Sequence, residues 1–150
     1  MIRQIINNQA YHVYNRSVLK MPLFRDPRDY LRFITKMSEL KKEMTIELSA
    51  YCLMSTHFHL ILREPALKKP TNMAQLSKFM QRLQNSYAKY FTIKYKHSGR
   101  VFQGAYKNKQ IENEEHFCII RDYIHQNPVR KKMVRSTSKW PYSSASNPNL

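Results

Sequence analysis

Apolar residues follow two different spacings along this chain. In some stretches they recur at every second position, and in others they recur at helical spacing. The strand pattern covers residues 11–18, 45–54, 57–63 and 100–107. Three helical stretches begin at Asp26-Pro27, at Thr71 and at residue 113, and the last two are expected to end at His97-Ser98-Gly99 and before Pro128. Because side chains alternate between faces in a strand and repeat every 3.6 residues in a helix, the predicted order is β-α-β-β-α-β followed by a helix.

This order predicts an α+β fold of the ferredoxin-like kind, in which a four-stranded antiparallel sheet carries two helices on one face. The C-terminal helix at residues 113–127, which contains Tyr123, is additional to that arrangement. A chain of 150 residues is most simply one domain, so residues 1–150 are expected to fold together, with residues 136–150 as an irregular tail. Such a fold hosts many functions, and the chemistry has to be sought in particular residues.

The charge of the chain indicates a polyanionic partner. Lysine and arginine number 26 against 10 aspartates and glutamates, which gives a net charge of +16. Self-repulsion of this size destabilises a compact chain, so a negatively charged partner is the natural explanation. The basic residues are spread over several elements rather than over one amphipathic helix, which favours nucleic acid over an anionic membrane surface.

The remaining composition points to the cell interior. The two cysteines, Cys52 and Cys118, form neither a CxxC motif nor a disulfide framework. No apolar run approaches the roughly 18 residues of a membrane span, and the N-terminal residues do not read as a signal peptide. We therefore expect a cytoplasmic protein that does not enter a membrane.

A His-x-His motif lies in one of the predicted strands. His57 and His59 are two residues apart and so share a face of the strand, whereas Phe58 points to the other face. Two adjacent imidazoles can chelate a divalent ion. The spacing alone is a weak signal in a chain with six histidines, and a pair of half-exposed sheet histidines is the alternative.

The predicted last helix carries a phenol and an amide one turn apart. On a helical wheel Tyr123 and Asn127 share a stripe with His116 and Ile120, whereas Arg121 and His125 face away, so we expect the stripe to point inward. The alternatives are a core tyrosine with a satisfied hydroxyl and an asparagine that merely ends the helix before proline.

Together these four groups suit the cleavage of a phosphodiester. A metal held by His57, His59 and the Asn127 amide oxygen keeps open positions for a phosphate oxygen. Phosphoryl transfer needs mainly charge stabilisation and in-line alignment. Tyr123 could then attack phosphorus and form a covalent phosphotyrosine, which would retain the bond energy and allow rejoining without ATP.

The chain resembles the IS200/IS605-type tyrosine transposases of the HUH endonuclease superfamily, and especially their REP-associated members. The residues that carry this resemblance are Tyr11–Arg16, Phe24–Asp26, Ala50–Leu60, Gly99–Gly104, Tyr123–Val129 and Trp140–Ser144. One departure is Met54-Ser55-Thr56, where members often have Met-Pro-Asn before the first histidine.

The resemblance implies roles for the same four residues. His57 and His59 match the HUH motif, Tyr123 matches the nucleophile, and Asn127 matches the third metal ligand of the family. It further implies Mg²⁺ or Mn²⁺ as cofactor, single-stranded DNA with a hairpin near the cleavage site as partner, and a 5′-phosphotyrosine intermediate. It leaves open whether the chain acts as a monomer or a homodimer, and whether Tyr123 acts in cis or in trans.

Eight basic residues are candidates for contacts to DNA phosphates, which would bring affinity and salt dependence but little sequence information. They are Arg16, Arg82, Arg100, Lys107, Lys109, Arg130, Lys131 and Lys132. Tyr106 is a candidate for stacking on a base. A solvated basic turn is the alternative for residues 130–132.

Two other functions remain compatible with the sequence. The chain could be a non-catalytic nucleic-acid-binding module on a ferredoxin-like sheet, with the histidines at its surface. It could also be an HUH nuclease of plasmid replication or transfer, against which the short length and the single tyrosine argue. Loss of cleavage with retained DNA binding in a Tyr123→Phe variant would distinguish the leading hypothesis from the binding module.

Overall fold

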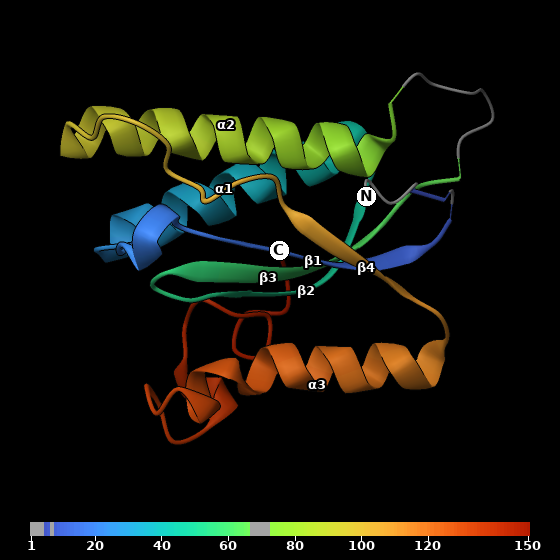
Figure 1. Cartoon of the computed structure of the whole chain (residues 1–150). Coiled ribbons are helices and arrows are strands. Elements are labelled where there is room, and N and C mark those ends of the chain that lie inside the picture. The colour runs from blue at the N-terminus through green and yellow to red at the C-terminus, as the bar shows by residue number, and fades with distance from the viewer. Residues whose placement is uncertain (1–4, 7, 67–72) are drawn as a thin grey trace.

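A four-stranded antiparallel sheet separates two long helices from a third in the computed structural model (Figure 1). Strands β1 (Ala10–Arg16), β2 (Glu47–Leu53), β3 (His57–Arg63) and β4 (Lys107–Ile111) stand in the order β2-β3-β1-β4. Helices α1 (Pro27–Met44) and α2 (Gln75–Tyr95) lie on one face, and α3 (Glu114–Arg130) lies on the other. The structure describes residues 5–6, 8–66 and 73–150. The predicted α+β, ferredoxin-like fold with an added C-terminal helix is therefore confirmed.

The main core lies between the sheet and helices α1 and α2. Alternate residues of the central strands, such as Val13 of β1 and Leu60 of β3, are fully buried in it. Helix α1 begins as predicted at Asp26, whose carboxylate accepts hydrogen bonds from the backbone N–H groups of Arg28 and Asp29. The predicted start of the second helix at Thr71 lies outside the described residues, and the described helix begins at Gln75.

The opposite sheet face is apolar at one end and polar at the other. A smaller core, which includes Ile61, Ile111 and Ile124, joins α3 to this face. The register pairs Arg16 with His57 and pairs Tyr14 with both His59 and Lys107. Because residues opposite each other in neighbouring strands share a face, these polar side chains gather beside α3.

The fourth strand differs from the prediction. It covers Lys107–Ile111 rather than residues 100–107, and Phe102 forms only an isolated bridge with Ser17. Val101 and Phe102 are buried in the main core, but from a loop. The apolar pattern that predicted a strand is therefore explained by burial without a ladder, whereas β4 is a mostly polar edge strand.

Helix α3 passes through Pro128 instead of ending before it. Proline removes one backbone donor, but later N–H groups continue the bonding: Lys131 donates to the carbonyl of Asn127 at 3.0 Å, and Met133 donates to that of Pro128 at 2.9 Å. The helix therefore extends to Arg130, and Lys131 is its C-terminal capping residue.

The C-terminal segment, which was predicted to be an irregular tail, is tied to the edge of β2. A 3-10 turn, Thr137–Lys139, precedes Trp140, whose indole Nε1 donates to the carbonyl of Leu53 at 2.9 Å. The backbone N–H of Ser144 donates to Tyr51 at 2.9 Å. These bonds cover an edge that would otherwise present unpaired backbone groups. Among the described residues, no helix has the length and apolar character to cross a membrane.

Candidate active site

His57 and His59 lie side by side on the sheet face that looks toward α3. Their ring centroids are 5.2 Å apart and their planes are nearly perpendicular. His59 is 8% exposed and His57 is half-buried. Burial, with lesser contributions from the neighbouring His12 and His57, lowers the pKa of His59 to about 3. Burial and the Lys131 ammonium lower the pKa of His57, an effect that the Asn127 side chain opposes. Both imidazoles are therefore neutral near pH 7, as metal ligands must be.

Asn127 presents an orphaned oxygen beside these rings. The residue is 3% exposed, and its side-chain Oδ1 is buried with no well-formed hydrogen bond in the described part of the chain. A buried amide oxygen without a partner is destabilising unless something absent from the bare chain satisfies it. Within the described residues, no three His, Cys, Asp or Glu side chains form a metal site by themselves. The third ligand beside the two histidines would therefore be the amide oxygen of Asn127. Two neutral imidazoles and one unpartnered amide oxygen fit a divalent ion.

Tyr123 lies near the histidines but is more accessible than predicted. Its ring centroid is 6.1 Å from that of His59, and its side chain is 48% exposed. The guanidinium carbon of Arg130 lies 4.1 Å from the ring centroid. Ile124 and Asn127 are among the buried residues of α3, whereas Tyr123 is not. The buried stripe therefore passes through Ile124, one position after the predicted Tyr123. An accessible phenol is what attack on a bound polymer requires.

His125 also differs from the prediction. It is half-buried rather than facing solvent, and its Nε2 lies 2.7 Å from the Ser144 hydroxyl of the C-terminal segment. Burial lowers its pKa, with a further contribution from the Arg121 charge. The prediction failed because the C-terminal segment, whose position a helical wheel does not contain, covers this side of α3.

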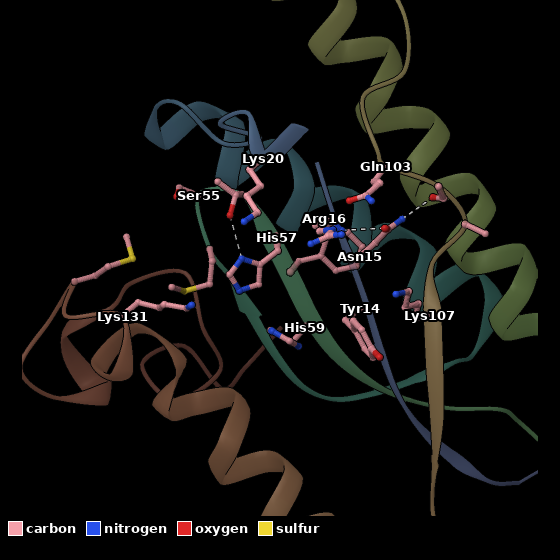
Figure 2. A pocket seen from close by; sticks show the side chains of 16 residues that line it. Tyr14, Asn15, Arg16, Lys20, Ser55, His57, His59, Gln103, Lys107 and Lys131 are labelled. Carbon is pink, nitrogen blue, oxygen red and sulfur yellow. Dashed lines mark hydrogen bonds between the residues drawn. The ribbon is translucent and has the colours of Figure 1, made fainter. Parts of the chain in front are cut away.

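A basic cleft of about 890 Å³ opens over the two histidines. Figure 2 shows His57, His59 and Tyr14 between Lys131 on one side and Lys107 on the other. Four cationic side chains line the cleft: Arg16, Lys20, Lys107 and Lys131. No described lining residue is a carboxylate, so the cleft is suited to a polyanion.

The structure separates the eight basic candidates into groups. Arg16, Lys107 and Lys131 line the cleft, Lys109 lies over the Tyr14 ring at 6.0 Å, and Arg130 lies over Tyr123. Arg82 is instead paired with Glu43 across α1 and α2, on the far side of the sheet. Arg100 and Lys132 are exposed and do not line the cleft.

Two features of the site were not found from the sequence. Lys20 lines the cleft from a short 3-10 turn in which it and Leu19 have positive φ angles, 54° and 53°. The Nε2 of His12 lies 2.9 Å from the Nδ1 of His59. No sequence pattern shows which strand lies next to β1, so this pairing could not be predicted.

Comparison with known proteins identifies the family. The family model described as "Transposase IS200 like" matches residues 5–127, most of the chain. The chain belongs to the IS200-like transposase family. The matched region runs to Asn127 and so includes both histidines and Tyr123. The resemblance inferred from the sequence motifs is confirmed.

Two solved structures share the fold of this IS200-like transposase. A REP-associated tyrosine transposase bound to a REP hairpin has a TM-score of 0.76 and 17% identity, over 100% of this chain and 87% of that one. A protein assigned as a transposase from Deinococcus radiodurans R1 has a TM-score of 0.53 and 17% identity, over 84% of this chain and 95% of that one. At this identity the likeness concerns the fold. The search of curated proteins found no match.

Proposed function

We propose that this IS200-like transposase is a metal-dependent endonuclease that cleaves and rejoins single-stranded DNA through a covalent bond to Tyr123. The observation that carries the proposal is the orphaned oxygen of Asn127 beside His57, one helical turn from an accessible tyrosine. A purely structural asparagine at 3% exposure would be expected to have its oxygen satisfied.

We propose Mg²⁺ or Mn²⁺ as the ion, as the resemblance to the family implies. His57, His59 and Asn127 would hold it, and when bound it would withdraw charge from a non-bridging phosphate oxygen. We use Mn²⁺ as the ion in the binding measurements below. The neutral state of both imidazoles leaves a lone pair available on each ring near pH 7.

Tyr123 supplies the nucleophile. Its phenolic oxygen forms a bond to phosphorus while the bond from phosphorus to the 3′-oxygen breaks, so that the 5′-phosphate stays on the tyrosine. The phenolic proton is lost, and the departing 3′-oxygen gains one. Attack by a 3′-hydroxyl on the phosphotyrosine reverses the reaction and rejoins the strand.

The charge of the cleft supports single-stranded DNA as substrate, near a hairpin. Four cationic side chains lie around the histidines, and a strand in the cleft would place its backbone among them. The structural neighbour was solved with a REP hairpin, which supports a hairpin as the feature next to the cleavage site.

The test is covalent trapping with 3′-labelled hairpin oligonucleotides that carry single-stranded flanks. With Mn²⁺ we expect a labelled protein band from the wild type, and none from a Tyr123→Phe variant that still binds the oligonucleotide. His57→Ala and Asn127→Ala should lose both the band and Mn²⁺ binding. If the wild type binds the oligonucleotide as well as the Tyr123→Phe variant does, but binds no Mn²⁺ and forms no adduct, the chain is instead a non-catalytic binding module.

A further inference from the structure

The cleft contains an aromatic side chain to which the cleavage reaction assigns no role. Tyr14 is half-buried, lines the cleft, and lies between β3 and β4 in the register, opposite His59 on one side and Lys107 on the other. Its ring centroid is 5.9 Å from that of His59. Figure 2 shows the Tyr14 side chain between those of His59 and Lys107.

The accessible position of Tyr14 distinguishes it from the tyrosines that are buried in the core. Tyr11, Tyr51 and Tyr87 each donate or accept a hydrogen bond through the hydroxyl. The Tyr14 hydroxyl has no such partner in the described residues. The hydroxyl of Tyr30, which is buried in the main core, likewise has no hydrogen bond among the described residues. The place of Tyr14 in the cleft, rather than its hydroxyl, therefore makes its ring available to a ligand.

The cations around Tyr14 fit a nucleotide rather than a free anion. Lys107 lies opposite Tyr14 on β4, Arg16 lies two residues further along β1, and both line the cleft. Lys109 lies 6.0 Å from the ring centroid of Tyr14. A nucleotide offers a planar base and a phosphate, which match an aromatic ring with flanking cations. The cleft volume of about 890 Å³ exceeds what one metal ion needs.

We propose that Tyr14 is the stacking platform for the nucleobase next to the scissile phosphate, with Lys107 and Arg16 on the flanking phosphates. This inference rests on the proposed function, because the ion held by His57 and His59 would fix the position of the scissile phosphate. Stacking on Tyr14 would hold the strand in register across the ion site without reading its sequence, since every base has an aromatic face.

The structure moves this role away from Tyr106, the residue that the sequence suggested. Tyr106 packs against the main core, and its hydroxyl lies 3.2 Å from that of Ser77 on α2. It therefore belongs to the other side of the sheet. Tyr106→Phe is a matched control, since it changes a tyrosine just before β4, the strand next to β1, that does not line the cleft.

The test compares two fluorescent probes: a short oligothymidylate, and a backbone of equal length in which every nucleotide is abasic. Both carry the same phosphates, so their difference isolates the bases. Tyr14→Leu should weaken oligothymidylate binding by about 5- to 150-fold, which corresponds to about 1–3 kcal/mol for one stacked base, and should leave abasic-backbone binding unchanged. Tyr14→Phe and Tyr14→Trp should restore the affinity, and Tyr106→Phe should change neither probe.

Lys107→Gln provides the complementary result. It should weaken the binding of both probes equally. It should also reduce the slope of the logarithm of the binding constant against the logarithm of the salt concentration by about 0.7. Equal weakening of both probes by Tyr14→Leu, or no weakening at all, would overturn the stacking role while leaving the proposed nuclease intact. Failure of the wild type to bind either probe would overturn both. Unchanged Mn²⁺ affinity in the Tyr14 variants shows that the fold is retained.

Discussion

The Nε2 atom of His12 lies 2.9 Å from the Nδ1 atom of His59, between two neighbouring strands and 47 residues apart in the chain. Both residues are buried, and burial lowers the pKa of His12 to about 4 and that of His59 to about 3. Two neutral imidazoles share one proton in this bond. If His59 carries it on Nδ1, its Nε2 presents a lone pair to an ion, and His12 acts as the acceptor that selects this tautomer.

Replacing His12 should therefore weaken metal binding without removing a ligand. We expect His12→Leu to lower Mn²⁺ affinity by about 10- to 100-fold, the range usual for a residue that orients a ligand histidine. His12→Gln keeps an acceptor and should lie closer to the wild type. Isothermal titration with Mn²⁺ near pH 7.5 measures both. Wild-type affinity in His12→Leu would show that the bond does not select the tautomer.

The stability of the fold should depend on Asp29 in acid. Asp29 is fully buried at the start of α1 and accepts hydrogen bonds from Lys94 at 2.8 Å, from the Arg25 backbone at 2.8 Å and from two tyrosine hydroxyls. Burial alone would raise its pKa, but the bonds from Lys94, Tyr95 and the Arg25 backbone outweigh burial and lower it. The unfolded chain therefore binds a proton at higher pH than the folded chain does.

It follows that the contribution of Asp29 is complete above its ordinary pKa of 3.8 and is lost as pH falls through its lower folded value. Asp29→Asn should destabilise the chain by about 2–3 kcal/mol near neutral pH, because it leaves Lys94 without its buried charged partner. The difference from the wild type should shrink below about pH 4. Urea unfolding at a series of pH values measures this, and a difference that grew in acid would contradict the assignment.

The elements that were predicted well are those whose evidence is local. The alternation at residues 57–63 placed both histidines on one face, and Asp26-Pro27 marked the start of α1. The predicted fourth strand failed because Val101 and Phe102 are apolar for burial in the core rather than for pairing in a ladder. Hydrophobicity alone does not separate these two causes.

The features that the sequence did not show depend on contacts between distant segments. The buried Glu64 accepts from the backbone N–H groups of Gln75 and Leu76, at 2.7 and 2.6 Å, and so caps α2 from the end of another strand. The pairing of His12 with His59 likewise requires β1 to lie beside β3. A helical wheel places Tyr123 and Asn127 on one stripe, but only the position of the sheet decides which of them is buried.

Arg130 should contribute to catalysis through the orientation of Tyr123. Its guanidinium lies 4.1 Å from the centre of the phenol ring, a contact worth about 0.5–1 kcal/mol at an accessible site. We expect Arg130→Gln to slow single-turnover cleavage by about 2- to 5-fold at saturating DNA. Lys131→Gln, which alters a cleft cation one residue away, should weaken DNA binding instead and leave the saturated rate unchanged. If the two variants had identical effects on the saturated rate and on DNA binding, Arg130 would have no separate role in orienting Tyr123.

The histidines, Asn127 and Tyr123 converge within a single chain, which leads us to expect cleavage by the tyrosine of the same protomer. Tyr123→Phe and His57→Ala should each be inactive, and an equal mixture of the two should stay inactive, because no chain then holds both intact parts. If two protomers instead exchange α3, half of all dimers in the mixture would pair the two variants. Each such dimer would contain one intact site of two, so about a quarter of wild-type activity would return. Labelled-adduct formation after preincubation of the mixture distinguishes the two outcomes. Recovery of activity would show that Tyr123 acts on the partner's site.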